Sequence, residues 1–152
     1  MPSFRLETVI AAPVVDCFEL SLTVDAHTAS MGTSGEQAIA GITSGALGLH
    51  DTVTWQARHF GVTFRMTSAI TEYEHPARFV DEQQRGPFRR WWHEHTFSEA
   101  SPGKTLMVDV VSFRSTLGPL GSLADTLVLE RYLPRLLTER NTWLKRSLEA
   151  GQ

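Results

Sequence analysis

The stretch LGSLADTLVLERYLPRLLTERNTWLKRSL, residues 120–148, has a hydrophobic pattern unlike that of the chain before it. Its leucines recur every three or four residues, so they fall on one face of an α-helix, with charged residues between them. We therefore predict a long amphipathic helix near the C-terminus. Proline removes one amide donor and clashes with the carbonyl four residues earlier, so Pro134 predicts a kink or break near Glu130. The apolar positions of this pattern are Leu120, Leu123, Leu127, Leu133, Leu136, Leu137, Leu144 and Leu148.

The chain before this helix mostly alternates apolar and polar residues, the pattern of half-buried strands. Residues 3–12 are predicted to form the first strand. Two short helical segments are predicted to follow, at residues 13–22, which begins with Pro13, and at residues 24–31. Turn signals such as SPGK at residues 101–104 separate the later alternating segments. Short turns favour antiparallel neighbours. The later strands are predicted at residues 36–43, 52–60, 62–73, 79–85, 89–99 and 105–115.

This order of elements predicts an α+β fold. A curved antiparallel sheet of about seven strands must cover its apolar face, and the long C-terminal helix is the only element large enough to do so. A sheet that curls around one helix leaves space between the two. The sequence therefore predicts a cavity between sheet and helix.

Composition limits the classes of protein to consider. A chain of 152 residues with 41% hydrophobic and 20% charged residues suits one soluble globular domain, residues 1–152. A net charge of −3 gives no case for a nucleic-acid partner, and no stretch approaches the ~18 apolar residues of an integral membrane span. The single cysteine, Cys17, and an N-terminus without a signal-peptide pattern predict a cytoplasmic protein. The sequence leaves a homodimer open.

The element order resembles the helix-grip fold of the START and birch-pollen-allergen superfamily, SRPBCC. The closer resemblance is to its bacterial polyketide cyclase/dehydrase-like members. It extends over nearly the whole chain, in APVVDCFEL (12–20), VTWQARHFG (53–61), ITEYEHPARFVDEQQRGPFRRWWHEHTF (70–97), GKTLMVDVVSF (103–113) and LGPLGSLADTLVLERYLPRLLTERNTWLK (117–145).

This resemblance implies a single ligand-binding domain that holds a small hydrophobic or amphipathic molecule, lipid-, polyketide- or quinone-like, between sheet and helix. The superfamily includes carriers as well as enzymes, so the fold does not decide the function. Its aromatic-ring hydroxylases need an iron–sulfur domain with several cysteines, which one cysteine excludes in this chain. We expect no cofactor.

Four polar residues are predicted to share the cavity face of three neighbouring strands. Side chains in a strand alternate between faces, so His93 and His95 point the same way, while Glu94 between them points the other. If the strands pair in the matching register, Asp81 and Asp109 join the two histidines. These four are the candidate catalytic residues, His93 or His95 as general acid/base and Asp81 or Asp109 orienting it.

Three interpretations of this group remain open. The two histidines could be hydrogen-bonded members of a pocket wall, a polyketide cyclase/dehydratase-type acid–base pair, or two ligands of a metal ion with an aspartate as the third. A His-x-His pair alone is a weak metal signal, so no metal is predicted. A protein-interaction module is the least favoured hypothesis for the chain, because the outer sheet face at Thr54, Gln56 and Arg58 is polar.

The rest of the predicted cavity wall is aromatic and aliphatic. Charged residues of the long helix, Arg131, Arg135 and Arg140, are predicted on its solvated face, unless one turns inward to meet a ligand carboxylate. The predicted ligand-binding residues are Trp55, His59, Phe64, Met66, Phe79, Gln83, Trp91, Phe97, Val111, Phe113, Leu133 and Leu137.

Overall fold

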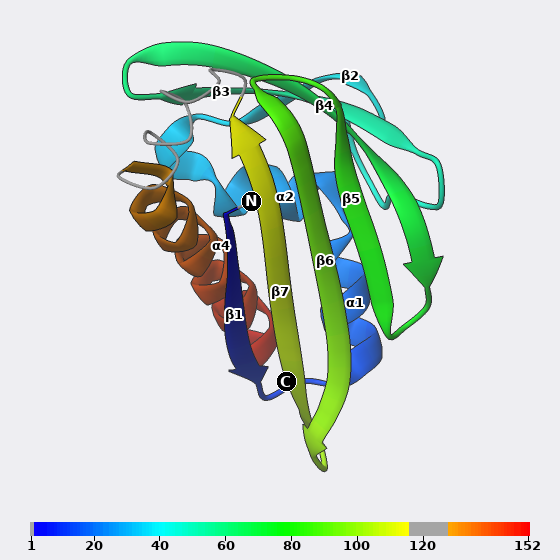
Figure 1. The fold of residues 1–152 in the computed structure, drawn as a ribbon. Coiled ribbons are helices and arrows are strands. Elements are labelled where there is room, and N and C mark those ends of the chain that lie inside the picture. The colour runs from blue at the N-terminus through cyan, green and yellow to red at the C-terminus, as the bar shows by residue number, and fades with distance from the viewer. Residues whose placement is uncertain (1, 116–127) are drawn as a thin grey trace.

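The computed structural model describes residues 2–115 and 128–152, which form one curved sheet packed around a long helix (Figure 1). Along the chain the elements are β1 (Ser3–Ile10), α1 (Val14–Ser21), α2 (Val24–Ser30), a 3₁₀ turn η1 (Gly32–Ser34), β2 (Gln37–Gly41), β3 (Thr52–His59), β4 (Val62–Glu74), β5 (Arg78–Arg85), β6 (Phe88–Ser101), β7 (Lys104–Ser115) and α4 (Glu130–Ala150). The predicted α+β helix-grip architecture is confirmed, including two short helices after the first strand. The predicted helical residues 120–127 lie outside the described residues.

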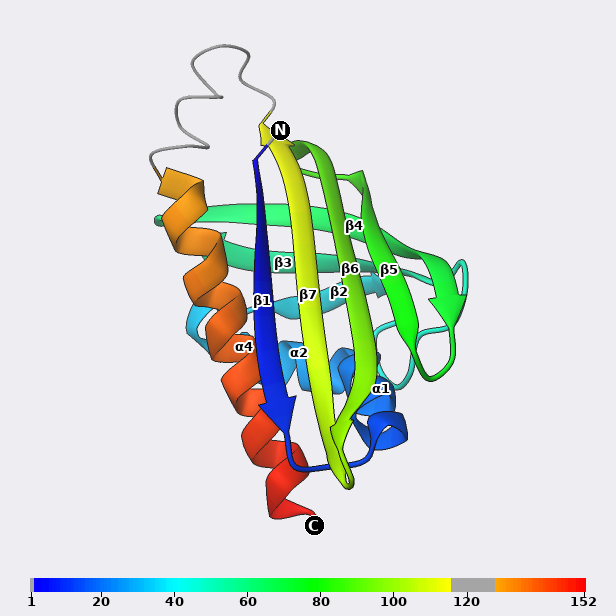
Figure 2. The same ribbon diagram turned by 60° about the horizontal axis from the view of Figure 1, so that its bottom comes forward.

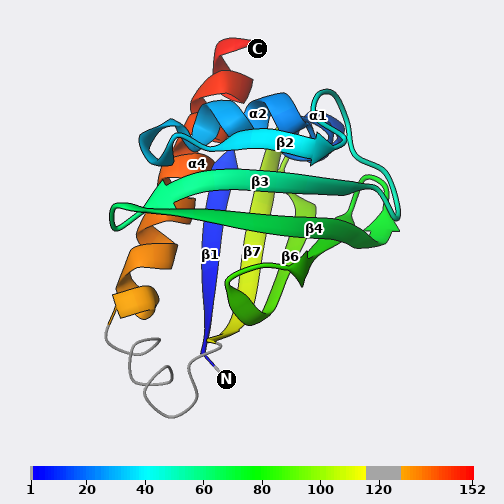
Figure 3. The ribbon, with the colours of Figure 1, turned by 90° about the horizontal axis from the view of Figure 1, so that it is seen from above.

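The sheet has seven strands in the order β1-β7-β6-β5-β4-β3-β2, each antiparallel to its neighbours. Strands β1 and β2 are consecutive strands of the chain, separated only by the short helices, yet they form the two opposite edges of the sheet. Seen from above, β2, β3 and β4 run across the direction of β1, β7 and β6 (Figure 3). This strong curvature accompanies register shifts in the β4–β5 and β6–β7 pairs.

Helix α4 lies along β1 and closes the open side of the sheet, while α1 and α2 cover its lower end (Figure 2). The helix begins at Glu130, four residues before Pro134, after a wider π-type turn at residues 128–129. Pro134 lies inside α4. The kink or break near Glu130 stays a prediction, because the predicted helical residues 120–127 before it lie outside the described residues.

The two halves of α4 meet different surroundings. In its second half Leu144 and Leu148 pack into a core with Phe18 of α1 and Phe97 of β6. Phe18 contacts Phe79 and Phe97 edge to face, with ring centroids 5.6 and 5.5 Å apart. In the first half Leu133 and Leu137 pack against Val111 and Phe113 of β7, and the same part of the helix lines the cavity.

Candidate ligand-binding site

A cavity of about 300 Å³ lies between the concave face of the sheet and the first half of α4. Apolar side chains form most of its wall, supplied by α4 and by strands β3, β4, β5 and β6. Eight residues predicted to line the cavity do so: Trp55, His59, Phe64, Met66, Phe79, Trp91, Leu133 and Leu137.

Four other residues predicted for the wall do not line it. Gln83 instead closes the β5–β6 turn, where its amide donates to the Phe88 carbonyl at 2.6 Å and accepts from the Phe88 amide at 3.2 Å. Phe97 is fully enclosed by the aromatic core around Phe18. Val111 and Phe113 are buried against Phe4, Leu6 and Leu133.

One side of the cavity carries the predicted polar group. In the observed registers Asp81 is opposite His93, which is opposite Val111, and His95 is opposite Asp109. This is the matching register that the grouping of the four residues requires, and strand alternation turns all four side chains to the concave face. Asp81, His93 and His95 line the cavity itself, whereas Asp109 lies behind them and is completely buried.

Asp109 is the centre of a buried hydrogen-bond network that ties the sheet to α4. His93 Nε2 lies 2.8 Å from Asp109 Oδ1, and the Asn141 amide donates to Oδ2 at 2.8 Å. Arg140 Nη1 lies 3.4 Å from Oδ1 and donates to Asn141 Oδ1 at 2.9 Å. Because an ionised carboxylate only accepts hydrogen bonds, His93 must donate from Nε2, which leaves Nδ1 facing Asp81 at 3.7 Å.

His95 is held by a second carboxylate and by stacking. Its Nε2 lies 2.7 Å from Asp81 Oδ2, and its ring stacks on Phe79 and His93 with centroids 4.1 and 3.7 Å apart. His95 Nδ1 lies 3.3 Å from Asp109 Oδ1 but lacks hydrogen-bond geometry. Within residues 2–115 and 128–152 it is the only buried side-chain nitrogen or oxygen without a hydrogen-bond partner. This nitrogen is buried beside Asp109 and so does not face the cavity.

The protonation states follow from burial and from these contacts. Burial disfavours the imidazolium form and, with the nearby His95, lowers the pKa of His93 to about 4, so His93 is neutral at neutral pH. Burial alone would raise the pKa of Asp81, but the charge that His93 gains in acid and the hydrogen bond from His95 outweigh it and lower that pKa to about 2. Asp81 keeps 22% of its side chain exposed, which limits the burial penalty.

Asp109 is also ionised. Its burial acts to raise its pKa, but the hydrogen bond from His93 and the charge of Arg140 together hold that pKa well below its usual value. The network thus places two carboxylates and one guanidinium around two imidazoles.

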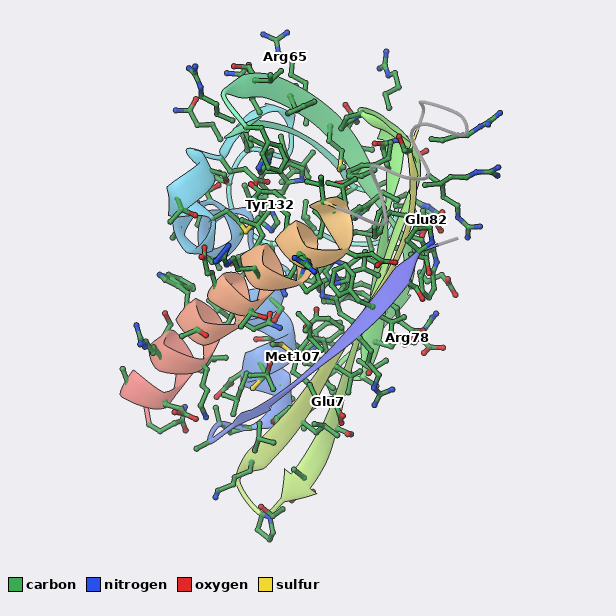
Figure 4. The ribbon with its side chains drawn as sticks, turned by 60° about the vertical axis from the view of Figure 1, so that its left-hand side comes forward. Glu7, Arg65, Arg78, Glu82, Met107 and Tyr132 are labelled. Carbon is green, nitrogen blue, oxygen red and sulfur yellow. The ribbon has the colours of Figure 1, made fainter. Side chains whose placement is uncertain are left out.

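A second polar group lies where the β3–β4 turn approaches the first turn of α4. There Nδ1 of His59 is hydrogen-bonded to the Tyr132 hydroxyl, and both side chains line the cavity. Tyr132 lies at the start of α4 (Figure 4). Burial lowers the pKa of His59. Next to this pair Phe60 contacts the Tyr132 ring and remains 63% exposed.

Sequence reasoning missed several polar residues of the wall. Arg140, predicted on the solvated face of the helix, is buried and lines the cavity, whereas Arg131 and Arg135 are exposed as predicted. The leucine spacing already indicates that Arg140 and Asn141 face inward, because they fall between Leu137 and Leu144 on the same stripe of the helix. His27 and Glu36 also line the cavity, joined at 2.7 Å between Nε2 and Oε1.

Asp81, His93 and His95 bring three potential metal-ligand atoms within 4.8 Å of one another. A zinc ion would lie about 2.0–2.1 Å from each nitrogen and close to the plane of each imidazole ring. The two rings are stacked at 3.7 Å with only 24° between their planes. One ion cannot lie near both planes at that distance, so metal binding would require one ring to turn. The observed arrangement suits hydrogen bonding better than coordination.

The fold defined by this sheet and helix is the START-like helix-grip fold. The sequence matches no family model, and no curated protein is similar to it at a significant level. No helix within the described ranges has the length and apolar character needed to cross a lipid bilayer.

Solved structures with this fold include an aromatase/cyclase, Zhui, from Streptomyces sp. R1128, at 14% identity and a TM-score of 0.77, covering 97% of this chain and 93% of that one. The protein TTHA0849 from Thermus thermophilus is 18% identical with a TM-score of 0.74, covering 96% of this chain and 99% of that one. A START superfamily protein from Mycobacterium smegmatis is 12% identical with a TM-score of 0.74, covering 99% of both chains.

Proposed function

We propose that this protein binds a small hydrophobic or amphipathic molecule in the cavity between the sheet and α4. The observation that carries the proposal is the cavity of about 300 Å³, whose wall is mostly apolar but carries a buried polar group on one side. A volume at the lower end of the usual range for ligand pockets, with few oriented polar groups, is typical of small-molecule sites. The ligand's apolar body would contact Trp55, Phe64 and Leu133, and its polar end would meet Asp81 and the histidines.

Filling part of the cavity is expected to weaken ligand binding without unfolding the protein. Ala57 of β3 lines the cavity, and Ala57→Phe would occupy part of the ligand's space. We expect the affinity for the neutral fluorescent dye N-phenyl-naphthylamine to fall at least about tenfold, since overlap with the ligand volume costs contact area. The dye's emission in a titration measures this.

Ala69→Phe is the matched control for this substitution. Ala69 is half-buried on β4, on the opposite face from its neighbours Ser68 and Ile70, which line the cavity. The Ala69→Phe variant should bind the dye with the same affinity as the wild type. Equal binding by Ala57→Phe and the wild type, with both folded, would contradict a cavity site.

A second candidate function is acid–base catalysis, such as a cyclisation or dehydration that removes a proton beside a carbonyl. Two observations favour it. Each imidazole faces an apolar cavity, and each is oriented by a carboxylate within 2.8 Å. At neutral pH His93 is unprotonated and can accept a proton through Nδ1, while Asp109 steadies the ring through Nε2. Zhui, the aromatase/cyclase with this fold, makes the chemistry worth testing here.

Proton abstraction can be measured without knowing the natural substrate. The bicyclic ketone tetralone exchanges its α-hydrogens for deuterium in heavy water when a base removes a proton and a deuteron returns. We expect the wild type to speed this exchange about 100-fold over buffer, the lower range for general-base catalysis. Nuclear magnetic resonance follows the loss of the α-proton signal.

The double variant His93→Gln/His95→Gln should lose the acceleration and still bind the dye. If the exchange rate with the wild type equals that with the double variant, the catalytic role is excluded and binding alone remains.

A further inference from the structure

The charges around the cavity are unbalanced. Three carboxylates line it, those of Glu36, Asp51 and Asp81, and the completely buried Asp109 lies directly behind. Among the described lining residues Arg140 is the one arginine, and no lysine joins it. The chain between residues 116 and 127 contains Asp125 and no lysine, arginine or histidine, so it adds no positive charge.

Arg140 already interacts with groups of the protein through one nitrogen of its guanidinium. Its Nη1 is directed at Asp109 Oδ1, 3.4 Å away, and at Asn141 Oδ1, 2.9 Å away. With 3% of its surface exposed, the guanidinium is largely compensated inside the protein. A ligand carboxylate that approached it would also approach Asp109.

On the side of the cavity formed by Asp81 and His93, the polar atoms that remain for a ligand are acceptors. Asp81 accepts from His95 with Oδ2 and keeps 22% of its side chain exposed beside the cavity. Because His93 donates through Nε2 to Asp109, its neutral ring carries a lone pair on Nδ1, which faces Asp81 at 3.7 Å. His95 Nδ1 is buried beside Asp109 and does not reach the cavity. Asp81 is ionised at neutral pH, as its lowered pKa of about 2 requires.

We infer that the cavity selects ligands whose polar end is a hydrogen-bond donor, either a neutral hydroxyl as in an alcohol or phenol or a protonated amine, and that it rejects carboxylates of the same size. This inference deepens the proposed binding function and rests on it. Like charges brought together in a site that excludes water repel strongly, and such repulsion is a common source of specificity.

Three compounds that differ only at one end test the inference. Decanol, decylamine and decanoate share the same ten-carbon chain, and each is titrated against the complex of the wild-type protein with N-phenyl-naphthylamine at pH 7. We expect decanol and decylamine to displace the dye at least about tenfold more effectively than decanoate. Decanoate binding as well as or better than decanol overturns the inference and leaves the binding function intact. If neither the dye nor any decyl compound binds by calorimetry, the proposed function itself fails.

A charge-removing variant assigns the selectivity to the cavity. Asp81→Asn keeps the shape of the side chain but removes its charge. It should lower the ratio of the affinity for decanol to the affinity for decanoate by about threefold or more. Glu82→Gln is the matched control, because Glu82 is the next residue on β5, accepts from Thr71 Oγ1 and lies outside the cavity lining (Figure 4). It should keep the wild-type ratio.

A folded Asp81→Asn variant with an unchanged ratio overturns the assignment. If thermal unfolding shows that this variant is not folded, Asp51→Asn removes another lining carboxylate and is judged by the same ratio.

Discussion

Replacing Asp109 by alanine is expected to lower the free energy of unfolding by about 3–5 kcal/mol, the cost of breaking a buried ion pair from one side. The substitution would leave Arg140 buried without its carboxylate and would remove the partners of His93 Nε2 and Asn141 Nδ2. Urea denaturation of the purified variant and wild type measures the difference. A loss below about 1 kcal/mol would mean that Asp109 is not the centre of this network.

Two further variants sharpen this test. Glu99→Ala removes an exposed carboxylate from β6 and should change stability by no more than about 0.5 kcal/mol. In the double variant Asp109→Leu/Arg140→Met both charges are replaced by apolar groups of similar size, so it should be more stable than Asp109→Ala. Comparing the two variants separates the destabilisation caused by a buried charge without its partner from the net contribution of the ion pair to the free energy of unfolding.

Stability should fall as the pH drops from about 6.5 to about 4, and His93 should cause a large part of the fall. In the unfolded chain His93 has the ordinary pKa of 6.5, whereas in the folded protein burial lowers it to about 4. Between these values the unfolded state binds a proton that the folded state does not, so acid favours unfolding. A difference of this size corresponds to about 3 kcal/mol, fully present above pH 6.5 and lost by pH 4.

His93→Gln is expected to flatten this part of the pH dependence, because glutamine does not titrate. Denaturation curves at several pH values for variant and wild type give the slope. His75→Gln removes a histidine whose side chain is 43% exposed and serves as the control. A variant slope equal to that of the wild type would show that His93 is not the residue responsible. The depressed pKa of Asp109 acts at lower pH, since its stabilisation is lost only as that carboxylate becomes protonated.

Much of the site could be predicted because strand alternation is a strict rule. It removed Glu94 from the His-x-His motif and placed His93, His95, Asp81 and Asp109 on one face, and short turns made their strands neighbours. In the structure Glu94 instead receives a hydrogen bond from Arg78 at 2.7 Å, away from the histidines. Periodicity also identified Leu133 and Leu137 of α4 as inward-facing.

What periodicity could not predict is how far along each strand the cavity extends. Phe97, Val111 and Phe113 share the concave face with the cavity residues, but Phe18 of α1 and Leu133 of α4 pack onto them. Packing between distant segments decides this, and a pattern of faces does not contain it. Arg140 was misplaced for a related reason, since a helix pattern cannot tell a solvated arginine from one compensated by Asp109.

The division of α4 into two halves has a consequence for how this protein could change its ligand. Asn141 and Arg140 fix the helix to Asp109, and Leu144 and Leu148 anchor it in the core, so the second half sets the position of the helix. In the first half, Leu133 and Leu137 line the cavity and also pack against Val111 and Phe113, whereas Leu136 lines the cavity and belongs to neither core cluster. Substitutions there can reshape the pocket while the anchor stays in place. Evolution or design could therefore change which ligand binds, through substitutions at these positions, while the second half of α4 keeps the fold stable.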